Sequence, residues 1–471
     1  MESTGLGSTL NANQTTAPKR SVAVIGAGWA GLAAAVRATQ NGDQVTLFEA
    51  TQQVGGRARC VNLKPLDSGV AGARSEATLR LDNGQHILIG AYHRTLDLMR
   101  TVGVNPQTLL MRLPLTLRYP DQSGFAIPRL PFPLNLAVGI LAARGWSAAD
   151  KWGLLQTAWQ WQRSHFSCAA QSTVADICKS LSPPVWRDLI EPLCVAALNT
   201  PAEQASAAVF LRVLKDALWG PSGSSDLLLP QVDLGRLMPE AARAWLEQNG
   251  ALLVMGHRVE ALSPVHQASG TALVSTCAGS ENINGWHING EFFDHVVIAT
   301  PALDAANLVH EHAPAWAAQA RNLKYQAIAT VYVQAALGTR LSQPMLALRT
   351  HTHAPAQFVF DRGQICIGPH TGTGATNAAT PGLLAFVASA PQVDRMSVQS
   401  QVLEQAREQL NLNGLHVLQT VMEKRATLAC TPGLIRPLGQ VTTRLTACGD
   451  YIAGPYPSTL EGAVRSGFAS L

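Results

Sequence analysis

The chain has few charged residues, no zinc-type cysteine spacing and no long apolar run. Charged residues make up 14% of its 471 residues, against about 25% in typical domains. The net charge of +4 comes without a basic run interleaved with aromatic residues, so we expect no nucleic-acid partner. None of the eight cysteines forms Cys-x-x-Cys or a zinc spacing with histidines, so we expect no metal site and free thiols in a reducing cytoplasm.

No stretch reaches the roughly 18 consecutive apolar residues that span a bilayer. The nearest candidate, Leu130–Ala143, is interrupted by two prolines. It leads into a tryptophan-rich region, and tryptophan favours the boundary between lipid and water. The segment is either a pair of ordinary core helices or a surface that dips into lipid. We therefore expect a cytoplasmic protein and leave open a peripheral contact with the inner face of the cytoplasmic membrane.

The length and the N-terminal residues of the chain indicate a tail followed by two domains. Residues 1–19 are rich in Ser, Thr, Asn and Gln and contain no apolar core, which is typical of a disordered tail and not of a secretory signal. The remaining length suits two domains with one core each. No internal repeat at a fixed period is visible.

A dinucleotide-binding unit is predicted at residues 22–49. The apolar, β-branched run 22–25 is typical of a buried parallel strand, and a helix over 30–40 and a second strand over 44–48 follow. Gly26 permits the sharp turn, Gly28 lets a pyrophosphate approach the backbone, and Gly31 lets helix and strand pack closely. Ala27 and Ala30 belong to the same phosphate-binding turn.

The second strand ends at Glu49, where a carboxylate can accept hydrogen bonds from the ribose hydroxyls of an adenosine. Such charge-assisted bonds contribute roughly 1.5–3 kcal/mol each. Strand, glycine turn, helix, strand and acid thus occur in the order of a nucleotide site. This pattern does not distinguish NAD from FAD.

The C-terminal segment 448–467 makes that distinction. A strand end delivers Gly449-Asp450, and a helix begins near Thr459 with Leu460-Glu461-Gly-Ala. Together with Gly55-Gly56-Arg57, the segment resembles the amine-oxidase and phytoene-desaturase superfamily of FAD enzymes. The resemblance implies that Asp450 bonds the ribityl chain and that the helix N-terminus faces the flavin, where it stabilises negative charge.

The same resemblance assigns further contacts and an organisation. Val259 is expected to hold the adenine, and Gly-Gly-Arg to meet the pyrophosphate. The implied fold is α/β, with a Rossmann-like, discontinuous FAD-binding domain and a mixed α+β substrate domain. The FAD domain is expected at residues 20–80, 225–300 and 435–471, and the substrate domain at 81–224 and 301–434.

Crossing points between the two domains are expected at Gly220–Ser225 and Pro301. Residues 317–337 and 359–367 are rich in β-branched and aromatic side chains, which predicts strands of a sheet roof over the cofactor. Residues 399–410 are expected to form a surface helix.

Two further segments, Leu81–Tyr92 and Glu191–Ser206, resemble the hydroxysqualene dehydroxylases, a branch of that superfamily. The resemblance implies an apolar C30 isoprenoid substrate whose allylic hydroxyl is removed reductively, with FAD as cofactor. It also implies an external reductant, either a pyridine nucleotide or a redox protein. Gly84 and Gln85 lie in the segment expected to pass the flavin.

Candidate catalytic residues come from the same two segments. His86 is the candidate general acid, although a histidine that only hydrogen-bonds its own loop fits the pattern as well. Asp82 is expected to be a structural acceptor of backbone amides. Asn199 and Thr200 either bind the substrate hydroxyl or form a helix cap and turn.

Three alternatives stay open. An amine oxidase commonly carries an aromatic residue where this chain has Thr459, and a lysine within a roof strand, whereas Lys324 lies only at a strand edge. A carotenoid desaturase shares the apolar substrate and the flavin frame. A flavin-binding scaffold without turnover would keep every cofactor motif.

Overall fold

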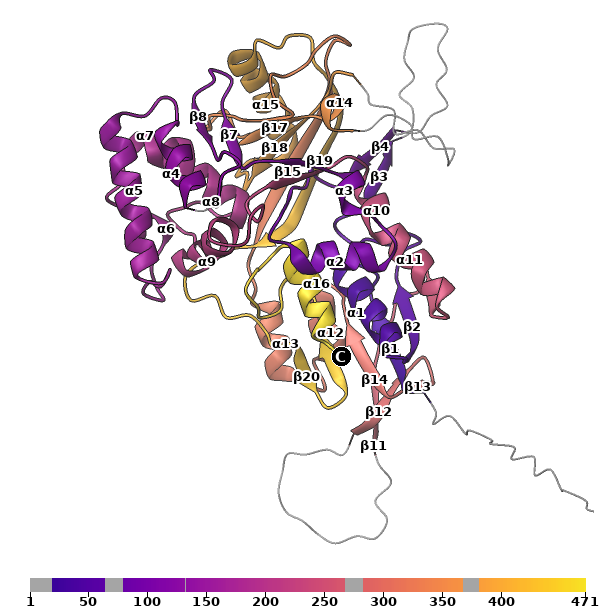
Figure 1. Cartoon of the computed structure of the whole chain (residues 1–471). Coiled ribbons are helices and arrows are strands. Elements are labelled where there is room, and N and C mark those ends of the chain that lie inside the picture. The colour runs from indigo at the N-terminus through magenta and orange to yellow at the C-terminus, as the bar shows by residue number, and fades with distance from the viewer. Residues whose placement is uncertain (1–18, 64–78, 132, 267–282, 367–380) are drawn as a thin grey trace, which may run out of the picture.

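The computed structural model describes residues 19–63, 79–131, 133–266, 283–366 and 381–471. Residues 1–18 of the expected tail and residue 367 of an expected strand lie outside these ranges. The structure has two large sheets, one in the lower and one in the upper half of Figure 1. The lower sheet has the strand order β10-β2-β1-β14-β21-β20.

The lower sheet carries the glycine turn. Its strands are β1 (Ser21–Ile25), β2 (Gln44–Glu49), β10 (Leu252–Met255), β14 (His295–Ile298), β20 (Gln440–Thr442) and β21 (Leu445–Ala447). All neighbours are parallel except β20 and β21. The strands predicted at 22–25 and 44–48 are confirmed, and these short apolar runs are buried, as is typical of parallel strands.

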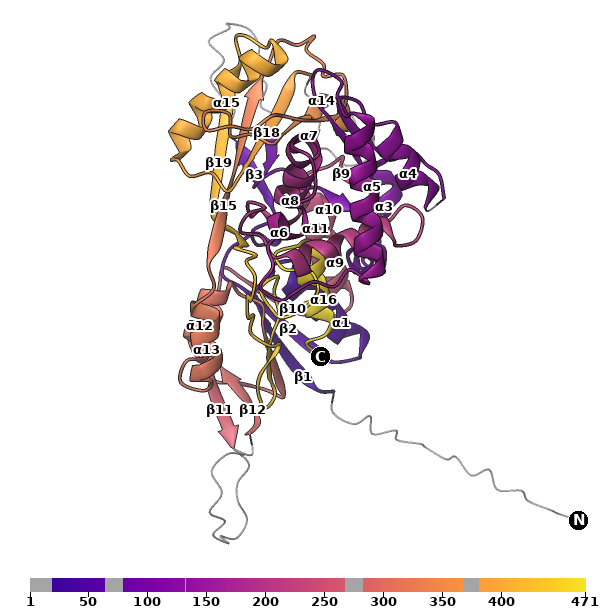
Figure 2. The same cartoon turned by 90° about the vertical axis from the view of Figure 1, so that its left-hand side faces the viewer.

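Helices α1 (Trp29–Gln40) and α16 (Leu460–Phe468) pack against each other beside this sheet. The helix predicted at 30–40 is thereby confirmed and begins one residue earlier. A side chain on Gly467 would place its Cβ 2.3 Å from the Ala30 carbonyl oxygen, so only glycine permits this crossing. The N-terminal and C-terminal motifs therefore lie side by side (Figures 1 and 2).

Further elements surround the lower sheet. They are α2 (His93–Thr101), α3 (Pro106–Leu109), α10 (Leu234–Leu237), α11 (Pro239–Gln248), α12 (Ala302–Val309), α13 (Pro314–Arg321) and the small sheet β11 (Ser263–His266), β12 (Ile283–Ile288) and β13 (Glu291–Phe293). Trp316 and Ala317 of α13 share a core with β1 and β14. The strand expected from 317 is thus wrong over 317–321, where an alanine-rich sequence forms helix.

The upper sheet is antiparallel, with the order β16-β17-β18-β15-β19. Its strands are β15 (Tyr325–Gln334), β16 (Met345–Ala347), β17 (Phe358–Asp361), β18 (Leu383–Ser389) and β19 (His416–Leu428). The predicted roof is therefore present, although β17 gives way to the short helix α14 (Arg362–Ile365). Helix α13 packs on the core of the lower sheet, and β15 is the next element along the chain and belongs to the upper sheet. We therefore propose that the chain passes from the FAD domain to the substrate domain between Arg321 and Tyr325, and not at Pro301.

One helix covers the outer face of the upper sheet. Helix α15 (Arg395–Leu410) buries Val398, Val402 and Ala406 against β15 and β18. Asp394 caps it by accepting hydrogen bonds from the amides of Met396 and Ser397. The surface helix predicted at 399–410 is confirmed and begins four residues earlier.

A helical lobe covers the inner face of the upper sheet (Figure 2). It consists of α4 (Leu134–Leu141), α5 (Ala148–Arg163), α6 (Val174–Ile177), α7 (Pro183–Val185), the π-helix Trp186–Ile190, α8 (Glu191–Leu198) and α9 (Ala207–Leu218). Short strands form three smaller sheets. They are the pair β3 (Cys60–Leu63) and β4 (Leu79–Asp82), the three strands β5 (Leu88–Ile89), β9 (Leu227–Pro230) and β6 (Leu110–Leu113), and the pair β7 (Thr116–Arg118) and β8 (Gly124–Ala126), which contacts β16 and α4.

The described residues were also compared with two patterns, that of a membrane-spanning helix and that of a metal site. None of their helices combines the length and the apolar character needed to cross a bilayer. In the same ranges, no group of three or more His, Cys, Asp or Glu residues is arranged to hold a metal ion. The seven cysteines that fall within them are free thiols, most of them buried.

Candidate functional site

The glycine turn between β1 and α1 opens into a cavity of about 570 Å³. Gly26 has φ +108°, and Gly31 lies so close to the turn that a Cβ there would be 1.8 Å from the Gly26 carbonyl oxygen. A Cβ on Gly28 would meet only the Gly56 Cα, at 3.8 Å. Gly28 is also the N-cap of α1 and offers no side-chain cap. The first-turn amides of α1 thus face a space that suits an anionic group.

Most of the residues predicted to bind the cofactor line this cavity. They are Gly26, Gly28, Ala30, Glu49, Gly55, Gly56, Arg57, Val259, Gly449, Asp450 and Leu460. Glu49 lies at the end of β2, where Oε2 accepts from the Ala27 amide at 2.7 Å and Oε1 accepts from the Thr51 amide and hydroxyl, each at 2.9 Å. Its carboxylate is therefore fixed over the turn. Gly31 lies beneath the turn and acts through packing.

Arg57 ties the two ends of the chain together at the cavity wall. Its Nη2 donates to Asp450 Oδ1 at 2.5 Å, and its Nη1 donates to the carbonyls of Arg425 and Ala426, each at 2.9 Å. The carboxylate of Asp450 is the main cause of the raised pKa of Arg57. A fixed cation therefore stands beside the turn that carries Gly449 and Asp450.

Glu461 does not line this first cavity, which we call the cofactor cavity because most of the residues predicted to bind the cofactor line it. Its side chain is fully buried, and its oxygens accept from the amides of Arg94 and Thr95 at 3.1 and 2.9 Å. Arg465 Nε donates to the same carboxylate at 2.7 Å. The structure therefore joins α16 to the N-terminus of α2 through Glu461. The start of α16 is capped by Thr459, whose hydroxyl accepts from the Gly462 amide.

A second cavity, of about 330 Å³, lies between the helical lobe and the upper sheet. Its walls are largely apolar and include Leu198, Phe210, Leu214, Phe358 and Phe360. Gly84 and Gln85 lie in this wall and not in that of the first cavity. Six residues line both cavities: Arg57, His86, Ala426, Ser458, Thr459 and Leu460. The two spaces therefore share a wall.

His86 lies in that shared wall in a defined protonation state. Its Nδ1 is 2.8 Å from the Gly84 carbonyl oxygen, and because a carbonyl only accepts, Nδ1 carries the proton. Burial lowers the pKa of the imidazole. The neutral ring thus leaves Nε2 as a hydrogen-bond acceptor.

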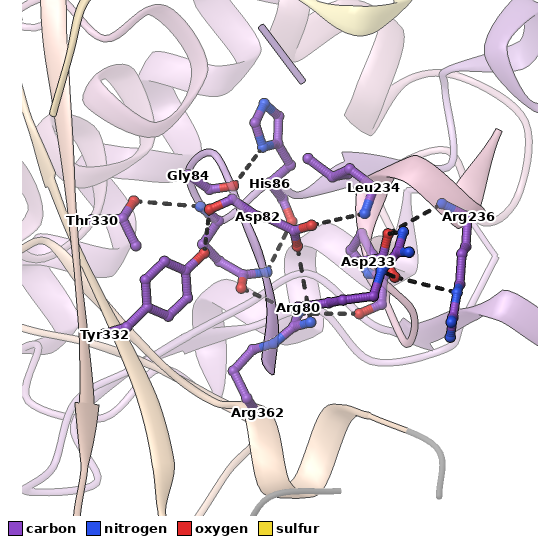
Figure 3. Close-up of polar contacts among 12 residues, drawn as sticks. Arg80, Asp82, Gly84, His86, Asp233, Leu234, Arg236, Thr330, Tyr332 and Arg362 are labelled. Carbon is purple, nitrogen blue, oxygen red and sulfur yellow. Dashed lines mark hydrogen bonds and ion pairs between the residues drawn. The ribbon is translucent and has the colours of Figure 1, made fainter. Parts of the chain in front are cut away.

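The segment from Asp82 to His86 is held by a buried polar network (Figure 3). Asp82 Oδ1 accepts from the Leu234 amide at 2.7 Å, and its carbonyl accepts from the Tyr332 hydroxyl at 3.0 Å. Arg362 lies 3.9 Å from the Asp82 carboxylate and donates to Gln85 Oε1 at 3.2 Å. Burial raises the pKa of Asp82 to about 6. Asp82 is therefore the structural acceptor expected from the sequence.

Asn199 and Thr200 connect the lobe to the upper sheet. Asn199 ends α8 with φ +46°, and its Nδ2 donates to the Thr427 hydroxyl at 2.8 Å and the Ala327 carbonyl at 3.2 Å. The Thr200 hydroxyl donates to the Leu198 carbonyl and accepts from the Cys430 amide, both at 3.0 Å. These bonds fit the cap-and-turn interpretation. Asn199 also lines the apolar cavity.

Sequence reasoning missed several residues of the cofactor cavity. Thr300 and Pro301 line it directly after β14, and the rule that ligands bind at the carboxyl ends of parallel strands would have found them. Trp29 and Tyr451 line it beside predicted residues. The apolar wall formed by Phe210 and Leu214 carries no sequence signal beyond that of an ordinary amphipathic helix.

Comparison with known proteins agrees with this geometry. The family described as "Flavin containing amine oxidoreductase" matches residues 29–470. A hydroxysqualene dehydroxylase of Rhodopseudomonas palustris is 27% identical, over 95% of this chain and 96% of its own length. One of Sinorhizobium fredii is 25% identical, with the same coverage. The family identifies the cofactor as FAD, and the donors around the first cavity fit that group.

Solved structures show the same fold. An oxidoreductase from Methanosarcina mazei superposes with a TM-score of 0.64 at 15% identity, covering 95% of this chain and 99% of that one. Putrescine oxidase bound to putrescine superposes with a TM-score of 0.61 at 12% identity, covering 96% and 98%. The α/β fold of flavin amine oxidases, with a largely parallel sheet and an antiparallel roof, is thus established.

Proposed function

Because the chain belongs to the family of flavin-containing amine oxidoreductases, we propose that it uses FAD to remove the hydroxyl group of hydroxysqualene reductively, giving squalene. Two relatives that match nearly its whole length carry the name hydroxysqualene dehydroxylase. The observation that carries the proposal is the largely apolar cavity, which shares a wall with the cofactor cavity at His86 and at 458–460. Such a cavity suits a hydrocarbon. Two carboxylates, Asp216 and Glu423, lie in its lining, and Asp216 is paired with Arg212 and accepts from the Tyr456 hydroxyl.

Each wall of the cofactor cavity has a separate task in this proposal. The first-turn amides of α1 bind the pyrophosphate, and the fixed carboxylate of Glu49 accepts from the adenosine ribose. Arg57 holds the Gly449–Asp450 turn in place through its bond to Asp450. When bound and reduced, FAD supplies the hydride.

The chain's own residues then orient and protect the substrate. The lobe and the upper sheet exclude water from the hydrocarbon. We propose that His86 Nε2 accepts a hydrogen bond from the substrate hydroxyl, because burial lowers the pKa of the ring and keeps it neutral. In the net reaction the hydride forms the new C–H bond, the C–O bond breaks, and the hydroxyl takes up a proton from the medium and leaves as water. An external reductant, a pyridine nucleotide or a redox protein, restores the reduced state.

The proposal is tested by product analysis of the FAD-loaded protein. Reduced protein is incubated without oxygen with hydroxysqualene in detergent, and the lipid extract is analysed by mass spectrometry. Parallel incubations with phytoene and an added electron acceptor, and with a diamine in air, test the desaturase and amine-oxidase activities. We expect squalene in the first incubation only. Desaturated carotenoid or peroxide instead, or no product in any incubation, would contradict the proposal.

A further inference from the structure

We propose that the outer face of α4 and α5 is a docking surface for a bilayer that contains anionic lipids. Leu134, Val138 and Leu141 lie on one side of α4, since they are four and three residues apart. Their exposed fractions are 59%, 39% and 59%. Leu130, just before the helix, is 42% exposed. Large apolar side chains thus project into solvent along the whole of α4.

Helix α5 extends the same surface. Trp152 and Trp159 are seven residues apart, hence on one side of the helix, and are 62% and 56% exposed. The two helices contact each other, and Lys151 Nζ donates to the Leu141 carbonyl at 2.7 Å. Figure 2 shows α4 and α5 side by side on the outside of the lobe. Other exposed leucines of the described chain lie outside α4 and α5, for example Leu337 in the loop after β15.

The charges around this surface are basic. Arg129, Arg144 and Arg163 are exposed, and the guanidinium of Arg163 lies 4.7 Å above the Trp159 ring. Asp150 is the sole carboxylate between residues 129 and 163, and it is engaged with Ser147 in the capping box of α5. Apolar side chains surrounded by arginines match the interior and the charged headgroups of an anionic bilayer. We therefore choose lipid over a protein partner.

The surface also has a use in the proposed reaction. The same lobe supplies α8 and α9 to the walls of the apolar cavity, so docking would place the cavity near the phase in which a hydrocarbon dissolves. This use rests on the proposed function. The docking itself depends only on the exposed side chains and their charges.

Vesicle flotation with the FAD-loaded full chain tests the docking. Vesicles contain either phosphatidylcholine alone or phosphatidylcholine with phosphatidylglycerol. One variant combines Leu134→Gln, Leu141→Gln and Trp152→Gln; the matched control is Leu337→Gln, a leucine that is 75% exposed on another part of the molecule. A charge variant combines Arg144→Gln and Arg163→Gln. Circular dichroism and bound flavin confirm that each variant is folded.

We expect wild type and the Leu337→Gln control to float with the anionic vesicles. The triple variant should partition at least about tenfold less, and the arginine variant should lose most of the preference for phosphatidylglycerol. Absence of flotation by wild type, or equal flotation of the triple variant and the control, would overturn the docking surface. Self-association of wild type that the triple variant abolishes, without flotation, would assign the face to a second copy of the chain.

Turnover in detergent separates this inference from the proposed function. If wild type binds vesicles but makes no squalene from hydroxysqualene in detergent, the docking surface stands and the proposed reaction fails. If all variants make squalene in detergent and none differs from wild type in flotation, the reaction stands and the docking surface fails.

Discussion

Gly28 and Gly31 lie three residues apart in one turn but have different surroundings. A Cβ on Gly28 meets only the Gly56 Cα at 3.8 Å and enters the space that we propose for the pyrophosphate, whereas a Cβ on Gly31 lies 1.8 Å from a backbone oxygen. We predict that Gly28→Ala lowers the affinity for FAD by roughly tenfold or more, since one or two phosphate hydrogen bonds are lost, and leaves the melting temperature of the apoprotein unchanged. Gly31→Ala should lower both.

Flavin retained after gel filtration and thermal melts of the apoprotein measure these two effects separately. A Gly28→Ala protein that binds FAD like wild type would show that the pyrophosphate does not approach the backbone there.

The role of His86 is tested by two substitutions with different hydrogen-bonding capacity. If Nε2 accepts a bond from the substrate, His86→Gln should keep much of the activity because it retains an acceptor, and His86→Leu should lose roughly tenfold or more. Because burial lowers the pKa of the ring, His86 should already be neutral at neutral pH, and the wild-type rate should show no loss there that follows its deprotonation. Equal losses in both variants, with a wild-type rate that falls as His86 deprotonates, would instead assign general acid catalysis to it.

The raised pKa of Asp82 predicts how the free energy of unfolding changes with pH, including the direction of the change. Burial raises its pKa from 3.8 to about 6, so the folded protein binds more protons than the unfolded chain between these values. The contribution of Asp82 to the free energy of unfolding therefore falls as pH rises from about 4 to 6 and is constant above 6. Asp82→Asn removes this slope, so its stability relative to wild type should rise by up to about 3 kcal/mol over that interval.

Denaturant titrations of both proteins between pH 4 and pH 7 measure the difference. A difference that does not change with pH, or that changes in the opposite direction, would show that the carboxyl group is not buried as described.

At the scale of elements, the junction of α16 and α2 depends on one buried carboxylate. Glu461 accepts from two α2 amides, the Thr95 hydroxyl and Arg465. Glu461→Ala leaves these donors unpaired, so we predict a loss of roughly 2–4 kcal/mol in the unfolding free energy of the apoprotein. Glu461→Gln, which retains an acceptor, should lose less. Weaker FAD binding with unchanged apoprotein stability would instead make Glu461 a direct cofactor ligand.

The elements differ in how far the sequence determines them. The strands at 22–25 and 44–48 are predictable because short apolar runs, a glycine turn and a helix pattern follow one another in the sequence and together indicate one unit. Residues 317–321 carry no comparable signal: their alanines favour helix, while the β-branched residues that follow belong to β15. The direction of the Glu461 side chain depends on α2, which is far away in sequence, so its motif alone does not reveal it.

In the whole molecule, the first cavity is formed by segments brought together from both ends of the chain. The cofactor cavity was largely predictable, because backbone geometry and glycine impose its motifs. The apolar cavity was not, because residues such as Phe210 and Phe360 are indistinguishable in sequence from ordinary core residues until the lobe meets the upper sheet. The position of His86 in the wall of both cavities is likewise a product of long-range packing.

In the proposed reaction, an apolar alcohol in the second cavity exchanges electrons with FAD in the first. The most direct measurement is a single turnover: the reduced, FAD-loaded protein is mixed with hydroxysqualene in the absence of oxygen, and flavin absorbance and extracted squalene are followed together. We predict that oxidised flavin and squalene appear at the same rate and in equal amounts. A flavin that stays reduced while hydroxysqualene is recovered unchanged would contradict the proposed reaction.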